Sequence, residues 1–596
     1  MSSLRDHGPR PAPFITIPKR RVAFLFVALL LLLIAVGTRT VWLQSVKQRT
    51  LSQYADGQQQ NTQILPAVRG DILDRNGEEL AVGEEAVTFY ATPSMMKDPA
   101  ATALRVSRIL GLSRIEEEQL VERLANPPSQ GFVYVARQVP REKAELLQDA
   151  KAEDDARNAE AERNDDKPVA TSLTSIGWND EENRMYPNGK VAGQIIGAVN
   201  IDNMGIAGIE SLYDRSLTGT PGKQVVVRDP QGTPIDVLKL QRERDGKPVQ
   251  LTIDSVLQAQ AEGVLERVMK SQNATSATAI VLDPRTGEVL VAASAPRVDP
   301  EKWSSFPGIA TRVPAITDQF EPGSTFKVVA VAGALEDKVV EPDTSFVLPP
   351  TMTFCKEKKT CTVGESHKRG TVVLNTADIL VQSSNIGTIK IAQRLGQKQY
   401  DVWTRRFGFG APTGIDFPGE IQGTVTPFNE WTKVSIGNIP IGQGIAVTPI
   451  QLISAYAAIA NDGVLVQPHL RMKVGNEKTI QPKSRRILSA KTAATMRGMF
   501  GGVVEEERGT GRKSQIPGYK VGGKTGTANF AENGVYVKGR YNASFVGFVP
   551  ANNPRLVTLV LVNDVGGYGG DVAAPAFEEI TEFALKRLSI APDGLE

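Results

Sequence analysis

Residues 321–327, with the sequence EPGSTFK, indicate both a local conformation and a chemistry. Pro322 and Gly323 predict a turn, and the apolar run that follows predicts a helix whose first turn holds Ser324. Lys327 comes one turn later, on the same face of that helix. Backbone N–H groups at a helix N-terminus favour developing negative charge. The spacing therefore suits a serine nucleophile that is activated by lysine in place of histidine.

Two further elements follow in order along the chain. Ser383-Ser384-Asn385 lies in a stretch, 376–395, whose apolar spacing predicts a helix, and Lys524-Thr525-Gly526-Thr527 lies on a glycine-rich predicted strand. A lone S-x-x-K means little, since a second one begins at Ser94 without the other two elements arranged after it. The plain alternative, a helix cap, a turn residue and a solvated lysine, is disfavoured for the three elements together.

The elements around this triple predict an α+β fold. Residues 277–293 read as two strands around a Pro-Arg-Thr-Gly turn, helical patterns cover 324–335 and 448–461, and further strands are expected at 518–527, 543–548 and 555–562. Strands, then helices, then strands favour an antiparallel sheet packed with helices.

The composition of the 596 residues excludes several classes of protein. Hydrophobic residues make up 41% and charged residues 22%, as in globular proteins, so wholesale disorder is not expected. Lys and Arg number 68 against 66 Asp and Glu, which gives no basic footprint for nucleic acid. Two Cys and three His are too few and too scattered for a structural zinc site or a disulfide scaffold. We expect neither a metal nor a cofactor.

One N-terminal segment predicts a membrane anchor. Residues 22–38 are uncharged and reach about 26 Å as a helix, and continuing to Leu43 gives about 33 Å. Arg39 would then snorkel and Trp42 would lie at the interface. The Lys-Arg-Arg cluster at 19–21 favours a cytoplasmic N-terminus with the bulk of the chain outside the cell membrane. A cleaved signal peptide is the alternative, although a convincing cleavage site is missing.

Two features of the exported part remain open. Cys355 and Cys361 flank a charged stretch that reads as a hairpin tip, and the oxidising compartment favours a disulfide over a free pair. Residues 148–167 are dense in charge, and we expect either an exposed helix or a mobile insertion there.

The triple S-x-x-K, S-x-N and K-T-G resembles that of the penicillin-binding transpeptidases. Three N-terminal segments resemble the motifs that pack the pedestal of class B members against their catalytic domain: Arg69-Gly70-Asp71 with Asp74-Arg75-Asn76-Gly77, Arg184-x-Tyr186-Pro187-x-Gly189, and Gly205-x-x-Gly208-Ile209-Glu210 with Tyr213-Asp214. Within class B, FEPGS at 320–324 and SSNIG at 383–387 are similar to the division-specific, FtsI-type branch.

The resemblance implies a domain order and a reaction. The expected parts are a cytoplasmic tail (1–21), a transmembrane helix (22–43), a pedestal of the class B dimerisation type (46–245) and a transpeptidase domain (250–590). The implied reaction is D,D-transpeptidation: Ser324 attacks the D-Ala-D-Ala bond of a peptidoglycan stem peptide, and an amine of a second stem resolves the acyl-enzyme.

The resemblance also assigns roles to side chains. Lys327 is the implied general base, Ser383 shuttles a proton, Asn385 holds Lys327 and the substrate amide, and Lys524 adds positive potential. Thr525 and Thr527 would bind the substrate carboxylate, with Gly526 between them, and the N–H groups of Ser324 and Thr527 would form the oxyanion hole.

The implied partners are stem peptides, β-lactams bound covalently at Ser324, the membrane, a septal glycosyltransferase and other division proteins, but no nucleic acid. Two alternatives share the fold: a D,D-carboxypeptidase or β-lactamase-like hydrolase, and a non-catalytic β-lactam sensor or scaffold. The intact triple weighs against the sensor, and no signature of a deacylating glutamate supports the hydrolase.

Overall fold

A computed structural model describes residues 19–45, 60–167, 169, 171–228, 234–355, 361–366, 369–477, 481–532 and 534–593. Contacts within the chain divide it into two compact units. The first comprises Met1–Pro66 and Pro221–Glu243, and the second comprises Ala67–Thr220 and Arg244–Glu596.

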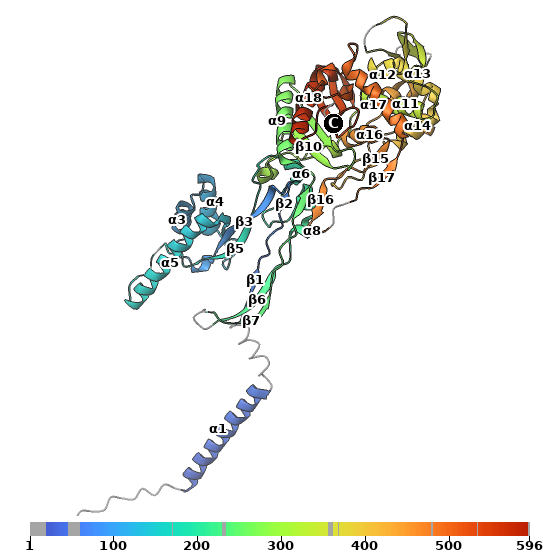
Figure 1. The fold of residues 1–596 in the computed structure, drawn as a ribbon. Helices are drawn as coiled ribbons and strands as arrows, with labels where there is room; N and C mark the ends of the chain where they lie inside the picture. The colour runs from blue at the N-terminus through green and yellow to red at the C-terminus, as the bar shows by residue number, and fades with distance from the viewer. Residues whose placement is uncertain are drawn as a thin grey trace, which may run out of the picture. The chain divides into compact units, whose positions relative to one another are not determined.

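The first unit holds the apolar helix and a small antiparallel sheet (Figure 1). Helix α1 (Lys19–Ser45) contains the uncharged predicted span, and its 27 residues are about 40 Å long. It is the one helix among the described residues that is long and apolar enough to cross a membrane. The sheet has the order β1-β6-β7, with β1 at Gln60–Leu65, β6 at Gly222–Arg228 and β7 at Pro234–Gln241.

The N-terminal part of the second unit is built on a six-stranded sheet of order β16-β8-β2-β3-β4, in which β5 also pairs with β3. A turn at Asn76-Gly77 joins β2 to β3, and Gly77 adopts a φ of 90° there. Three helices accompany this sheet. The bounds are β2 Ile72–Leu73, β3 Glu79–Ala91, β4 Val133–Pro140, β5 Ile176–Met185, β8 Val249–Leu251, β16 Arg471–Val474, α3 Pro99–Leu110, α4 Arg114–Ala125 and α5 Arg141–Arg163.

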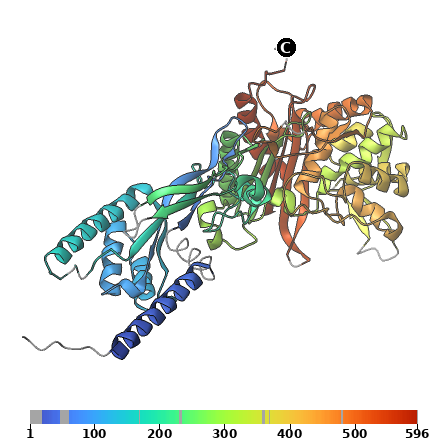
Figure 2. The same ribbon diagram turned by 90° about the horizontal axis from the view of Figure 1, so that it is seen from below.

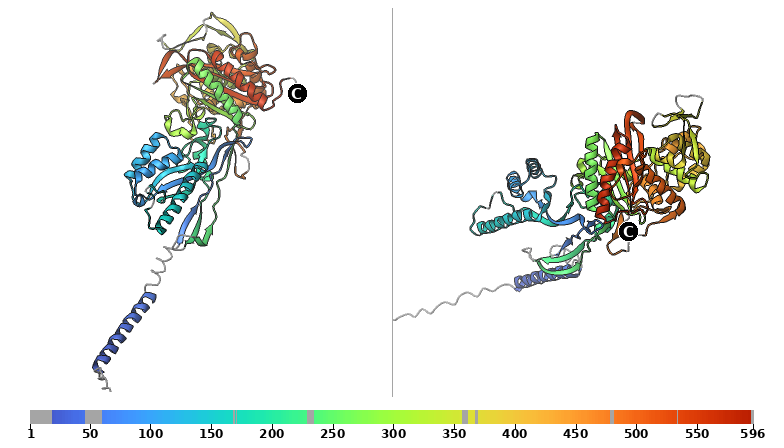
Figure 3. Two further views of the ribbon diagram at one scale, coloured as in Figure 1. Left: turned by 90° about the vertical axis from the view of Figure 1, so that its left-hand side faces the viewer. Right: turned by 45° about the horizontal axis from the view of Figure 1, so that its top comes forward.

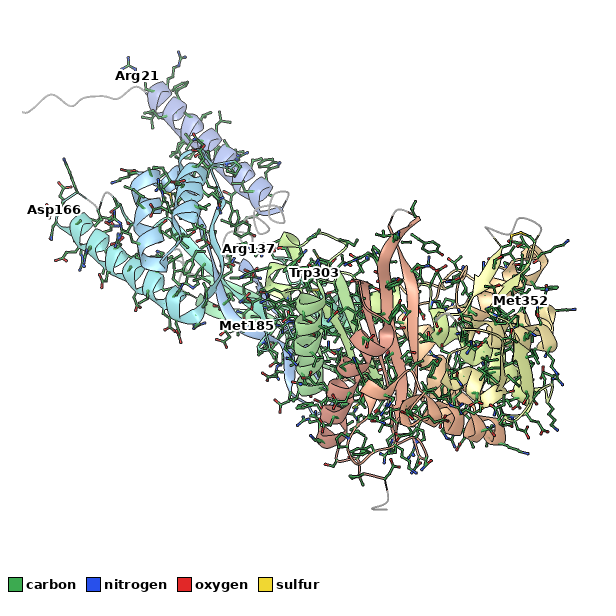
Figure 4. All side chains as sticks on the ribbon, turned by 90° about the horizontal axis from the view of Figure 1, so that it is seen from above. Arg21, Arg137, Asp166, Met185, Trp303 and Met352 are labelled. Carbon is green, nitrogen blue, oxygen red and sulfur yellow. A yellow bond between two sulfur atoms is a disulfide. The ribbon has the colours of Figure 1, made fainter. Side chains whose placement is uncertain are left out.

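The charge-dense tract forms the second half of helix α5, which ends a few residues before Asp166 (Figure 4). Most of its side chains are exposed, but Asp154 is fully buried and its carboxylate accepts from the Leu173 amide at 2.9 Å. This hydrogen bond attaches the helix to the loop that follows it. The tract therefore forms a helix, as one of the two expectations had it, and the outer face of that helix is exposed.

A buried ion-pair network joins the three N-terminal motif segments. The carboxylate of Glu210, which is fully buried, accepts from Arg69 at 2.7 Å and from Arg184 at 2.7 Å. Arg69 also donates to Asp214 at 2.8 Å. Each motif thus supplies one part of a single cluster. The carboxylates stabilise the arginines, because an unpaired cation is costly to bury. These residues hold the N-terminal part together.

The C-terminal part is organised by a five-stranded antiparallel sheet of order β10-β9-β20-β19-β18. Its strands are β9 (Ser276–Leu282), β10 (Val289–Ala295), β18 (Gly522–Glu532), β19 (Val535–Val549) and β20 (Leu556–Val565). Nearly every residue of β9 and β10 is buried, and most of these residues are apolar. Strand β18 forms one edge of the sheet, with β19 as its neighbour.

Helices cover both faces of this sheet. On one face α9 (Ser255–Gln272) and α18 (Gly569–Arg587) pack side by side (Figure 3). On the other face lies a larger helical layer, seen in yellow and orange in Figure 2. The layer contains η3 Gly323–Phe326, α10 Pro314–Thr317, α11 Lys327–Glu336, α12 Thr376–Val381, α13 Asn385–Leu395, α14 Gln397–Arg406, α15 Ser435–Asn438, α16 Pro449–Ala460 and α17 Ala490–Glu505.

Small two-stranded sheets complete the helical layer. Helix α16 is buried along its whole length and begins at the capping box of Thr448 and Gln451. These antiparallel sheets pair β11 with β14, β12 with β13 and β15 with β17. Their bounds are β11 Ser345–Leu348, β12 Thr351–Thr353, β13 Thr362–Gly364, β14 Val372–Asn375, β15 Val464–Val466 and β17 Ser484–Arg486. The α+β architecture predicted from the sequence is confirmed.

The buried network generates a stability prediction. Replacing Glu210 with Ala leaves two arginines buried without their shared carboxylate, and we expect a loss of about 3–5 kcal/mol in the free energy of unfolding. The matched control is Glu118→Ala, which removes an exposed ion pair with Arg114 and should cost no more than about 0.5 kcal/mol. Denaturant unfolding measures both, and equal losses in the two variants would contradict the role given to Glu210.

Candidate active site

The predicted nucleophile, Ser324, lies in a tight turn that packs directly on strand β18. Gly323 adopts a φ of 55°, and a Cβ there would lie 2.8 Å from the backbone oxygen of Thr527. The amide of Lys327 donates to the Ser324 carbonyl, so the two residues share one helical turn, as predicted. Among the described residues the Ser324 side chain has no hydrogen-bond partner, and it is half-buried. Its hydroxyl is therefore free to meet a ligand.

Lys327 is fully buried and points at the second motif. Its Nζ donates to Ser383 O at 2.6 Å, to Ser383 Oγ at 3.2 Å and to Asn385 Oδ1 at 2.7 Å. Burial lowers the pKa of Lys327 from its usual 10.5 to about 7, because desolvation disfavours the ammonium form. The amine can therefore act as a base near neutral pH.

The second motif corrects one prediction about secondary structure. Residues 376–395 form two helices, α12 and α13, rather than one. Ser383 lies between them with a φ of 56°, an uncommon conformation for a residue that is not glycine. Ser384 then caps α13 by accepting from the Gly387 amide at 3.0 Å. The break turns Ser383 and Asn385 toward Lys327, whereas a continuous helix would spread them around its axis.

The third motif lies on the edge strand β18. Lys524 is fully buried, and its Nζ donates to Thr525 O at 3.2 Å and to Thr525 Oγ1 at 3.3 Å. Burial lowers the pKa of Lys524 well below its usual value, and the nearby charge of Lys327 lowers it further. The positive charge of Lys327 thus makes Lys524 easier to deprotonate.

The residues after Lys524 differ in what they contact. Thr525 Oγ1 is 2.9 Å from Thr510 Oγ1, and Thr527 Oγ1 accepts from the Gly569 amide at 3.0 Å. Gly526 has no room for a side chain, since a Cβ would lie 2.9 Å from Thr325 Cγ2, 3.0 Å from Pro322 O and closer still to Ser544 Oγ. The glycine is what lets the serine turn touch the strand.

Comparison with known proteins identifies the family. Residues 277–582 match the model of the penicillin-binding protein transpeptidase domain, and residues 64–251 match that of the penicillin-binding protein dimerisation domain. The first match alone covers more than half of the chain. The chain belongs to the class B penicillin-binding proteins.

Similarity to this family extends over nearly the full chain. This penicillin-binding protein is 32% identical to the probable peptidoglycan D,D-transpeptidase PbpC of Pseudomonas aeruginosa, covering 97% of each chain. It is 30% identical to peptidoglycan D,D-transpeptidase FtsI of Escherichia coli, over 96% of this chain and 93% of that one. It is 31% identical to stage V sporulation protein D of Bacillus subtilis, over 97% and 87%.

A solved structure agrees with the fold of this penicillin-binding protein. The crystal structure of penicillin-binding protein 3 from Mycobacterium tuberculosis, in complex with aztreonam, has a TM-score of 0.66 at 27% identity. The match covers 89% of this chain and 98% of that one. The predicted domain boundaries, 46–245 for the pedestal and 250–590 for the transpeptidase domain, stay predictions.

The structure also places residues outside the three motifs, among them the two cysteines for which the sequence favours a disulfide. Cys355 and Cys361 form a disulfide, with their Cα atoms 5.6 Å apart. His469 is buried, and its backbone pairs with the turn between β9 and β10, while His367 lies outside the described residues. Glu365 and Thr510, which contact the motifs, were missed, because no pattern in the sequence links either residue to the triple.

The close packing at Gly526 generates a second prediction. Gly526→Ala forces the serine turn off strand β18, and we expect covalent labelling by a fluorescent penicillin to slow about a hundredfold, as for a displacement of about 1 Å. Gly498→Ala is the control, because a Cβ there meets nothing within 4 Å and alanine suits helix α17. Wild-type labelling by the Gly526 variant would show that the turn does not need this contact.

Proposed function

We propose that this protein is a peptidoglycan D,D-transpeptidase that works through a serine acyl-enzyme and is a target of β-lactams. One observation carries the proposal. A lysine that is held by Ser383 and Asn385 and has a pKa of about 7 lies one helical turn from a half-buried serine hydroxyl. The relatives named as D,D-transpeptidases and the aztreonam complex of a structural neighbour support the same reaction class.

In the first half-reaction Ser324 Oγ forms a bond to the carbonyl carbon of the penultimate D-Ala. Neutral Lys327 accepts the hydroxyl proton, which is its role as general base. The bond between that carbon and the nitrogen of the terminal D-Ala then breaks. Ser383, whose Oγ is 3.2 Å from Lys327 Nζ, passes the proton to the leaving amine. Free D-Ala departs, and an ester at Ser324 remains.

The second half-reaction reverses these steps with a different amine. The amine of a neighbouring stem peptide attacks the ester carbon, loses a proton to Lys327 and forms the crosslinking amide. The ester bond to Ser324 breaks, and the proton returns to Ser324 Oγ. Atoms and charges balance without ATP or a cofactor, since one amide bond replaces another.

Binding of the donor stem falls to strand β18 in this proposal. Its free edge suits an extended peptide, which would add as a further strand. The hydroxyls of Thr525 and Thr527 bind the terminal carboxylate, and the protonated form of Lys524 adds positive potential. The N–H groups of Ser324 and Thr527 form the oxyanion hole, which the contact of the serine turn with β18 brings together. Asn385 holds the substrate amide while its Oδ1 holds Lys327.

For the cellular role we propose septal wall synthesis during division. The FtsI-type motifs at 320–324 and 383–387 support it, as does similarity to FtsI and to stage V sporulation protein D. Helix α1 would anchor the protein in the membrane with the N-terminus in the cytoplasm, because basic residues precede the span. A septal glycosyltransferase and other division proteins are the proposed partners.

The nucleophile is tested by labelling with a fluorescent penicillin. We expect a stable covalent adduct with the wild type and none with Ser324→Ala, because the attacking oxygen is gone. Ser94→Ala, in the second S-x-x-K, is the control and should label like the wild type. Persistent labelling of Ser324→Ala would refute the nucleophile, and rapid release of hydrolysed penicillin by the wild type would favour a hydrolase instead.

The pKa of Lys327 predicts how acylation depends on pH. The base must be neutral, so the labelling rate should rise with pH, reach half of its maximum near pH 7 and level off above it. Below the midpoint each pH unit removes about nine-tenths of the neutral amine and slows labelling about tenfold. Rates at several pH values test this, and a profile flat through neutrality would exclude Lys327 as the base.

A further inference from the structure

Glu365 belongs to none of the three motifs, yet its carboxylate contacts the second one directly. The side chain is 4% exposed. One oxygen accepts from the backbone N–H of Asn385 at 2.7 Å, and the other accepts from Ser384 Oγ at 2.6 Å. The carboxylate therefore sits at the N-terminus of helix α13, where negative charge is favoured. Arg369 donates to the same carboxylate and to Ser384 Oγ, the latter at 2.8 Å.

The backbone of Gly364, next to Glu365, orients the side-chain amide of Asn385. The side-chain Nδ2 of Asn385 donates to Gly364 O at 2.9 Å. With its nitrogen turned that way, Asn385 presents Oδ1 to Lys327 Nζ at 2.7 Å. Residues 364 and 365 thus fix both the backbone and the side chain of Asn385, and through Asn385 they fix the amine of Lys327.

A disulfide-closed hairpin holds these two residues in place. Gly364 ends strand β13, which pairs with β12, the strand that carries Met352 (Figure 4). The Cys355–Cys361 disulfide closes the hairpin, and the Phe354 amide donates to Cys361 O at 3.0 Å. Glu365 is therefore presented by a covalently braced segment.

We propose that Glu365, with Arg369 as its counter-charge, is a positioning residue for acylation that sets the orientation of Asn385 and the charge balance at Lys327. The proposal rests on the proposed function, in which Lys327 is the base. Glu365 need not touch the substrate, since it acts through Asn385 and through its field.

The two charges act on Lys327 in opposite directions. Burial is the main cause of its low pKa, while the carboxylate of Glu365 raises that pKa and the guanidinium of Arg369 lowers it. Lys524, on β18, is the other charged group coupled to Lys327, and Ser383 and Asn385 face the amine as neutral groups. Removing either member of the Glu365–Arg369 pair must therefore move the pKa of Lys327 in a defined direction.

The test measures the rate of fluorescent-penicillin labelling across neutral pH in the full chain. In Glu365→Gln the carboxylate is lost and Arg369 remains, so the midpoint of the rise should move down by about one pH unit. In Arg369→Gln the carboxylate remains alone, so the midpoint should move up by a similar amount. Glu365→Gln should also lower the maximal rate, because Asn385 is held less firmly.

Glu336→Gln is the matched control. Glu336 caps helix α17 as Glu365 caps α13, accepting from the Ser489 amide at 3.0 Å and from Ser489 Oγ at 2.8 Å. It lies at the far end of α11, about 14 Å along the helix from Lys327. The variant should lose similar stability without moving the pH midpoint of labelling. The control therefore separates the loss of a helix-capping carboxylate from the loss of a charge that acts on Lys327.

Opposite shifts in the two variants support the proposal. A common midpoint in the wild type, Glu365→Gln and Arg369→Gln overturns it, whatever the maximal rates. If Glu365→Gln fails to fold, as judged by thermal unfolding, the direction of the shift in Arg369→Gln decides alone. Absence of Ser324-dependent labelling in the wild type would instead overturn the proposed function.

Discussion

The burial of the Lys327 amine is the constraint on which the rest of the active site depends. An ammonium group out of water is so costly that a buried lysine gives up its proton near neutral pH unless a carboxylate neutralises it. Here three oxygens from Ser383 and Asn385 surround the amine, and among the described residues no carboxylate lies within ion-pair distance. The Lys327 amine is thus hydrogen-bonded, but no carboxylate within ion-pair distance among the described residues neutralises its charge. That condition requires the break between α12 and α13, and the charge of Lys327 in turn favours the neutral form of Lys524.

The same chain treats buried cations in a second way. Arg69 and Arg184 are also buried, but both share the carboxylate of Glu210. Compensation makes that cluster an attachment point between segments far apart in the sequence, whereas the uncompensated lysines make a reactive site. Glu365 stands between the two cases. Its carboxylate is neutralised by Arg369 and by helix α13, yet it lies close enough to influence Lys327.

The motif triple could be predicted from the sequence because each element is local. The turn at Pro322-Gly323, the apolar run behind Lys327 and the glycines before Lys524 fix short-range conformation, and the structure places them as expected. The break at Ser383 could not be predicted, since apolar residues continue at helical spacing on both sides of it. The left-handed conformation of Ser383 ends α12 with two backbone hydrogen bonds, from the Ser383 amide to Leu380 O and from the Ser384 amide to Ile379 O, and Lys327 donates to the Ser383 carbonyl. Glu365 was missed for a related reason, because its contacts with Ser384 and Asn385 cross about twenty residues without any periodic signal.

By itself the sequence determined the family, the α+β class, the apolar helix and the identity of the three motifs, because order, spacing and local propensity are written along the chain. Tertiary structure decided what those residues can do. It buried Lys327 and Lys524, turned Asn385 with the help of Gly364, and let the serine turn touch β18 at Gly526. Reactivity depends on desolvation and on distances between groups far apart in the chain, and both quantities exist only once the chain is packed.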